Sequence, residues 1–165
     1  MKNLIHKPRG VFLTGFGLLE LVIVIGVVSV SMFALLGAGQ VAHRAVGEAS
    51  RRQQAVFLLE EGMEALRLLR DDAWSNISGL NTGQSYALSF IGGTWEATTA
   101  PQYVEGLFER TFMLREVFRD TGDNIATGGT LDPETRHAEV RVSWSSRGAT
   151  STIMGTSWIT NLFLE

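Results

Sequence analysis

The chain has 165 residues, 45% of them hydrophobic, which suffices for one globular domain besides a membrane-spanning segment. It contains no cysteine, which excludes disulfides and cysteine-ligated metal or redox sites. The net charge of −3 conceals an asymmetry: residues 1–15 carry three basic side chains and no acid, and the remaining residues carry 11 basic and 17 acidic ones. The acidic remainder disfavours a general nucleic-acid-binding surface, which needs a basic patch.

An apolar segment runs from Phe16 to Leu36 directly after the basic residues. As a helix it would span ~31 Å, about the thickness of a bilayer's hydrocarbon core. The preceding basic residues predict that the N-terminus lies in the cytoplasm. A plain signal anchor begins in the same way, whereas the hydrophobic part of a secretory signal peptide runs only ~7–15 residues. Neither explains Glu20, the single charge in the segment, because a buried acid in a membrane is costly and usually functional.

The sequence Gly15-Phe16, followed by Glu20 and a span rich in Ile, Val and Leu, resembles the class III signal of type IV pilins and pseudopilins. The resemblance implies that a prepilin peptidase cleaves between Gly15 and Phe16, that Phe16 is then N-methylated, and that Glu20 serves subunit assembly. Gly26 also stands where the family often has glycine. Residues 1–15 are therefore expected to be a leader peptide and residues 16–39 a transmembrane and assembly helix.

The chemistry of the new N-terminus fits this interpretation. Cleavage would create an α-amino group at Phe16, with a pKa of ~7.7–8.0 in the open. A cation at a helix N-terminus opposes the helix dipole and needs a nearby anion. Glu20 of a neighbouring subunit would supply that anion. A buried pair of opposite charges fixes the register between packed helices.

Residues 40–74 keep a helical pattern without proline. An apolar stripe recurs at three- and four-residue steps and is expected to face a core. It consists of Val56, Leu59, Met63, Leu66 and Leu69. The charges on the other side, among them Glu61 and Glu64, are expected to form a solvated face. The stretch from Ala55 to Trp74 is similar to the helix exit of minor pilins of the type IV pilus modification type. Gly37, Gly39, Gly47 and Gly62 each lower the helix propensity, and Gly37 marks either a place where the helix loosens or bends, or close helix packing.

The C-terminal half predicts an antiparallel sheet over residues 85–165. Residues 85–91 and 94–98 alternate around Gly92-Gly93, which is typical of a β-hairpin with a primed turn. Residues 107–118 predict a strand with a bulge or an exposed end, in which Phe108, Phe112, Leu114 and Phe118 share a face that Arg110 and Glu116 interrupt.

A loop is expected at 120–129 and a turn at 131–135. In the next strand Ala138, Val140, Val142 and Trp144 face inward, and residues 151–160 form the last strand. One apolar sheet face needs a cover, which the helical stripe supplies. The predicted fold class is thus α+β and pilin-like: a long N-terminal helix, transmembrane and then amphipathic, packed on a C-terminal antiparallel sheet, with 40–165 as the extracytoplasmic domain.

No catalytic, cofactor or metal site is expected. His6, His43 and His137 lack metal-ligand spacing, and no P-loop or dinucleotide motif is present. Asp120, Asp123, Asn124 and Asp132 offer oxygens of the kind that bind calcium in some pseudopilins, but their spacing differs from that of an EF-hand and a solvated loop is the preferred interpretation.

The functional hypothesis is a non-enzymatic minor pilin or pseudopilin of a type IV pilus-like or type II secretion filament. Its expected partners are other pilin subunits, prepilin peptidase, the assembly machinery and the cytoplasmic membrane. It would cross that membrane once, with its N-terminus inside, before entering a cell-surface or periplasmic filament. The alternative is a single-pass membrane anchor that presents an extracytoplasmic binding module for adhesion or ligand capture. Secretion, motility and DNA-uptake systems are not separated by the sequence.

Overall fold

The computed structural model describes residues 17–146 and 148–162. Its contacts divide the chain into two units, Met1–Val46 and Gly47–Glu165, and each is described by itself. One helix, α1 (Leu18–Asp72), contributes to both units. The segments predicted as 16–39 and 40–74 are therefore joined in a single helix, which ends two residues before Trp74. A short helix, α2 (Ser75–Ser78), follows.

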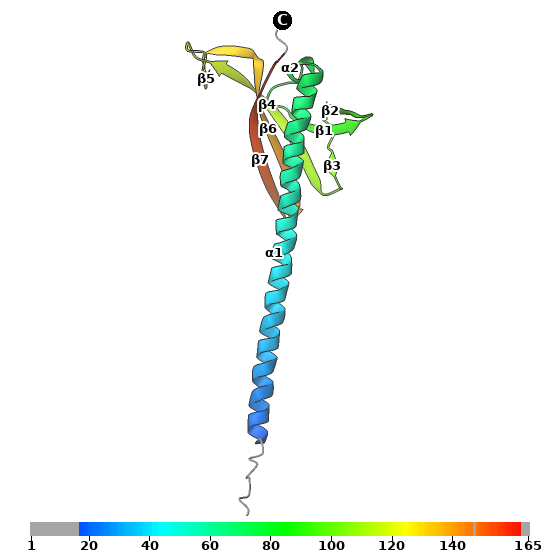
Figure 1. The fold of residues 1–165 in the computed structure, drawn as a ribbon, viewed down its shortest axis with the longest axis vertical. Coiled ribbons are helices and arrows are strands. Elements are labelled where there is room, and N and C mark those ends of the chain that lie inside the picture. The colour runs from blue at the N-terminus through cyan, green and yellow to red at the C-terminus, as the bar shows by residue number, and fades with distance from the viewer. Residues whose placement is uncertain (1–16, 147, 163–165) are drawn as a thin grey trace, which may run out of the picture. The chain divides into compact units, whose positions relative to one another are not determined.

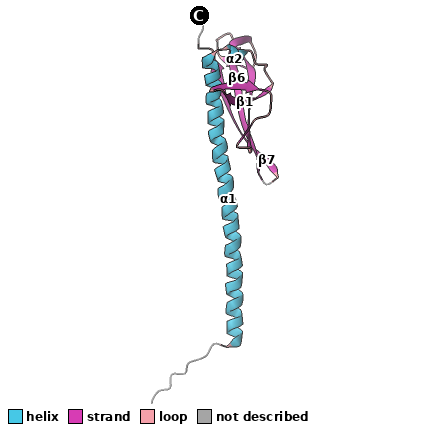
Figure 2. Ribbon diagram, turned by 90° about the vertical axis from the view of Figure 1, so that its right-hand side faces the viewer, coloured by secondary structure: helices cyan, strands magenta, loops and turns pink. Residues whose placement is uncertain are grey.

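The second unit contains an antiparallel sheet in the order β2-β1-β4-β6-β7. Two short strands, β3 and β5, pair with β4 outside this order. Figure 1 shows the strands, and Figure 2 shows that they form a layer on one side of the second part of α1. The strands are β1 (Ser85–Ile91), β2 (Thr94–Thr98), β3 (Tyr103–Val104), β4 (Phe108–Arg119), β5 (Ile125–Ala126), β6 (Thr130–Ser146) and β7 (Ala149–Thr160). The predicted α+β class, with a long N-terminal helix packed on an antiparallel sheet, is confirmed.

The β1–β2 hairpin was expected from its sequence and is confirmed in register. Phe90 pairs with Trp95 and Ile91 with Thr94. The connecting Gly92 and Gly93 have φ values of 62° and 93°, the left-handed conformation that a primed turn needs at both central positions. Side chains with a Cβ rarely adopt it, so the two glycines fix where this hairpin turns.

The core lies between α1 and the sheet. The inward-facing residues of β6 were predicted correctly, since Ala138, Val140, Val142 and Trp144 are all buried. The helix contributes Leu66 and Leu69 from the predicted stripe. Its buried positions also include three small residues that hydrophobic periodicity did not emphasise: Ala55, Gly62 and Ala65.

One expectation about the helix was wrong: Val56 was placed in the buried stripe but is 39% exposed. Glu61 is exposed, as expected for the solvated face, but its carboxylate also forms an ion pair with Arg110 of β4 that the sequence did not indicate. Both residues lie at the flanks of the stripe, where the position of the covering strands, and not the helical period alone, decides what is buried.

A register shift between β4 and β6 corrects the predicted strand and turn boundaries. Glu116 pairs with Arg136, whereas the next residue, Val117, pairs with Asp132. The intervening residues of β6 bulge out of the ladder, so the expected turn at 131–135 is an irregularity within a continuous strand. The shift also changes which side chain faces inward: Val117 is buried, and Phe118, which alternation along the strand grouped with Phe108, Phe112 and Leu114, is only half-buried.

Arg110 is the least expected member of the interior. The sequence suggested that it interrupts the apolar face of its strand, yet its side chain points inward and is only 4% exposed. The guanidinium pairs with the Glu61 carboxylate of α1, which is itself half exposed, and its carbon lies 5.0 Å from the centre of the Trp95 ring. Arg110 thereby joins β4, α1 and β2 through one side chain.

Gly62 provides the space that Arg110 occupies. A Cβ at position 62 would lie 3.0 Å from Val140 Cγ1 and 3.1 Å from Arg110 Cδ. Gly62, which the sequence marked only by its low helix propensity, is thus a site of close packing between α1 and the sheet. The corresponding positions at Gly37 and Gly47 have no atom within 4 Å.

We predict opposite effects for alanine at two helix glycines. Gly62→Ala should destabilise the domain by about 1 kcal/mol, because overpacking outweighs the gain in helix propensity. The matched change Gly47→Ala should stabilise it by up to about 1 kcal/mol, since only the propensity gain remains. Chemical denaturation of the full chain in detergent measures both. A stabilised Gly62→Ala variant would contradict this account of the packing.

We predict unequal effects for two acids on the same helix. Glu61→Ala should cost about 2 kcal/mol, because it leaves the buried Arg110 without its counter-charge. Glu64→Ala removes only an exposed ion pair with Arg67, 3.0 Å long, and should cost less than about 0.5 kcal/mol. Urea denaturation curves compare the two variants, and equal losses would show that Arg110 does not require its partner.

Candidate functional site

The first unit contains the part of α1 that is long and apolar enough to cross a membrane. Its large apolar side chains are exposed all around, as shown by Leu18 at 82% and Phe33 at 75%. A helix that is apolar on every side must be surrounded by lipid or by other apolar helices. By length and composition this segment is a candidate membrane span.

The polar groups of this segment differ in how they are satisfied. The hydroxyls of Ser29 and Ser31 donate to the carbonyls of Ile25 and Val27 at 2.7 and 2.8 Å, so they need no external partner. Glu20 lies in the first turn of α1 and has no hydrogen-bond or ion-pair partner within the part of the chain that is described. Its carboxylate is favourably placed at the positive end of the helix dipole.

The remaining residues of the predicted signal cannot be compared with the structure. Gly15 and Phe16, the expected cleavage and methylation positions, lie outside the described residues, as does the leader that precedes them. Of the predicted site residues only Glu20 is therefore placed. It stands three residues beyond Gly17, the first described residue, at the exposed start of the apolar helix.

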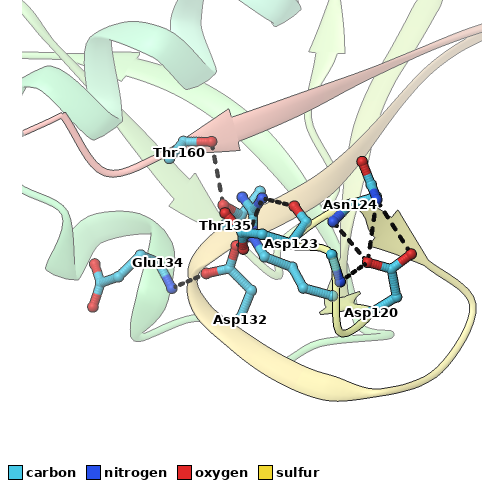
Figure 3. Close-up of polar contacts among 9 residues, drawn as sticks. Asp120, Asp123, Asn124, Asp132, Glu134, Thr135 and Thr160 are labelled. Carbon is cyan, nitrogen blue, oxygen red and sulfur yellow. Dashed lines mark hydrogen bonds and ion pairs between the residues drawn. The ribbon is translucent and has the colours of Figure 1, made fainter.

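A second group of polar residues gathers where β4, β5 and β6 meet (Figure 3). Asp120 accepts hydrogen bonds from the backbone N–H groups of Gly122 and Asn124 at 2.8 and 2.9 Å. Arg119 Nε donates to Asp132 at 2.7 Å, and the N–H of Glu134 donates to the other carboxylate oxygen of Asp132 at 2.9 Å. The carboxylates suggested as calcium ligands are thus held by protein donors, one of which is a cation.

These hydrogen bonds shift the pKa values of the carboxylates downward. Asp132 is nearly buried, which opposes ionisation, but the hydrogen bonds from Arg119, Thr135 and the Glu134 N–H outweigh that effect and lower its pKa. The backbone N–H groups of Asn124 and Gly122 lower the pKa of Asp120. The hydrogen bond to Asp132 in turn raises the pKa of Arg119. Within the described residues no group of three or more acids and histidines is spaced to hold a metal ion.

The bulge in β6 is attached to the end of β7. The N–H and side-chain amide of Asn161 donate to the carbonyl and the carboxylate of Glu134 at 2.8 and 2.7 Å. The Thr135 and Thr160 hydroxyls lie 3.3 Å apart, as Figure 3 shows. The polar cluster therefore organises the loop and fixes the C-terminal strand, which is a structural role.

A groove of about 210 Å³ lies between α1 and the β1–β2 hairpin. Phe90, Trp95 and Leu68 form much of its lining, and Asp72 is its one charged lining residue. Ligand sites with catalytic activity usually bring several polar groups together in such a cavity. The groove offers an apolar contact surface and a single carboxylate.

The chain matches no protein-family model, no curated protein and no solved structure in the comparisons made. The candidate site is therefore defined by its own residues: an exposed apolar helix whose first turn carries one acid that has no partner in the described part of the chain.

We predict that acid weakens the polar cluster. The pKa values of Asp120 and Asp132 are lower in the folded chain, so their stabilisation is present above the ordinary carboxyl pKa and is lost as the pH falls through the folded values. Below about pH 4 the stability should decline, and Asp132→Asn should reduce both the stability at neutral pH and the steepness of that decline. Thermal unfolding across this pH range measures both effects, and an unchanged slope in the variant would contradict the assignment.

Proposed function

We propose that the chain is a structural subunit of a type IV pilus-like or type II secretion filament, a minor pilin or pseudopilin. Prepilin peptidase cleaves it after Gly15, Phe16 is methylated, and the apolar helix then leaves the membrane to pack among the helices of neighbouring subunits. The observation that carries the proposal is Glu20, a lone acid in the first turn of a helix that is apolar on all sides, which has no partner among the described residues.

An isolated anchor has no physical reason to keep this acid. A carboxylate near mid-membrane costs ~2.5–3.5 kcal/mol on insertion scales. The cost is offset once a neighbouring subunit places its N-terminal amine beside the carboxylate, because each charge then has a partner in a medium of low dielectric constant. Glu20 therefore acts between subunits, and the serine hydroxyls farther along the helix act within one.

The second unit supports a structural role. Its most buried ionisable side chain, Arg110, is used to hold α1 against the sheet, and its carboxylate cluster stabilises a loop. Placed outside the cytoplasmic membrane, this domain would be displayed on the cell surface or in the periplasm. The filament proposal includes no chemistry performed by the chain; the chain is a substrate of the peptidase.

We predict that the mature protein begins at methylated Phe16. Mass spectrometry of its N-terminal peptide, from cells with an active prepilin peptidase, should show loss of residues 1–15 and the added mass of one methyl group. Replacing Gly15 by a bulky residue should leave the leader attached. An intact leader in the wild-type protein would exclude the filament proposal.

The same cells separate the proposal from a membrane-anchored binding module. Glu20→Ala should leave cleavage and membrane insertion intact but reduce recovery of the protein in sheared filaments, because the amine of the neighbour loses its partner. Ser29→Ala, in which only an internal hydrogen bond is lost, is the matched control and should assemble normally. A Glu20→Ala protein that functions and localises normally would favour the anchor.

A further inference from the structure

β7 is an edge strand with none of the usual protection against pairing. It has 12 residues and, unlike most natural edges, contains neither a charge nor a proline. Its register with β6 is continuous from Thr135–Thr160 to Ser146–Ala149, without a bulge. The opposite edge strand, β2, has five residues and carries Glu96. Among the described residues no strand pairs with the outer side of β7 (Figure 1). An unpaired strand edge presents a row of backbone N–H and C=O groups.

One member of the apolar stripe on α1 is left exposed beside this edge. Leu59 and Met63 of α1 lie over Gly155 of β7, each 3.2 Å from where a Cβ would be. Val56 precedes them by three and seven residues and so lies on the same side of the helix. The sheet ends at β7, and Val56 remains 39% exposed although its sequence position belongs to the apolar stripe.

The other face of β7 is also incompletely covered. Gly155 faces α1, so the residues that alternate with it point away from the helix. Met154 and Trp158 are two of these, and they are 54% and 56% exposed. A residue placed opposite them on an adjacent strand would contact them as a cross-strand neighbour.

We propose that β7 binds an extended segment of another protein, which adds one antiparallel strand to the sheet. The backbone groups of the edge provide the hydrogen bonds, as in other cases of strand addition. Alternate residues of the segment are apolar where they pass beneath Val56 and Met63, and β-branched where they lie beside Met154 and Trp158. The paired part of the segment carries no charge, because β7 has no charged side chain that could form an ion pair with it.

A second copy of the chain fits this edge less well. Its β2 edge is short and bears a carboxylate.

The test uses the full chain in detergent micelles and a synthetic peptide of alternating valine and threonine with terminal lysines. The absence of native cysteine allows Thr152→Cys, on the exposed face of β7, to carry a single environment-sensitive fluorophore. We expect a saturable change in fluorescence. A peptide with proline at alternate positions lacks half of the backbone donors and should give no such change. Equal binding of both peptides, or of neither, would overturn the proposal.

Two helix variants test where the added strand lies. Val56→Glu should weaken peptide binding at least about tenfold, because the carboxylate would be buried against an apolar strand. Phe57→Glu is the matched control: Phe57 is 59% exposed but lines a pocket with Val104 and Phe108, away from β7, so affinity should change less than about twofold. Circular dichroism verifies that both variants keep the fold. Equal losses of affinity would refute the placement of the added strand beside β7 and beneath Val56.

The choice of partner is tested without peptide. The Thr152→Cys protein, left unlabelled under oxidising conditions, should remain monomeric on a non-reducing gel. A disulfide-linked dimer would assign the edge to a second copy and overturn the choice made here. None of these measurements involves leader cleavage or filament assembly, so failure of strand addition and failure of the proposed function are distinguishable.

Discussion

An antiparallel sheet with one apolar face must be covered, and in this chain the second part of α1 provides the cover. The two parts of the helix therefore have different surroundings. Its first part is apolar on all sides, while its second part buries a stripe against β4, β6 and β7 and leaves charges on the other side. The way this helix lies over the strands explains three features. Arg110 is buried beneath it, α1 approaches the sheet closely at Gly62, and Val56 stays exposed.

Arg110 illustrates how a charge is accommodated beneath such a cover. Its guanidinium is buried, but Glu61 remains half exposed, so water still solvates one member of the pair. The Trp95 ring faces the guanidinium and supplies a contact that suits a weakly hydrated planar cation. The arrangement fixes the rotation of α1 relative to β4, because another helix rotation would leave the cation buried without its carboxylate.

Local sequence patterns predicted most of the fold. The long helix and the inward residues of β6 were deduced from hydrophobic periodicity, and the β1–β2 hairpin was deduced from its two glycines. The β6 irregularity was misplaced as a turn because Asp132 and Pro133 are typical turn residues, and only the pairing with β4 and β7 shows that the strand continues. The inward Arg110 could not be predicted either, because its partner is 49 residues away in sequence.

The candidate site likewise combines a residue that the sequence predicted with features that it did not predict. Glu20 was singled out because an acid in an apolar run is unusual wherever the run is placed, and the structure adds that it has no partner within the described chain. The partner proposed for Glu20 belongs to a neighbouring subunit and is therefore not part of this chain. The open edge of β7 was not predicted from the sequence, because strand order determines which strand is at an edge.

Two glycines on facing elements also govern which sequences this fold accepts. Gly62 on α1 meets Val140, and Gly155 on β7 meets Leu59 and Met63. Because no residue is smaller than glycine, substitutions at either position can only push the helix and sheet apart. At Gly155 the opposing atoms are the mobile ends of long side chains, whereas at Gly62 one is a branched valine held in the core. The mutational tolerance of the two positions should therefore differ, with position 155 accepting alanine more readily, and a change at position 62 requiring a smaller residue at 140.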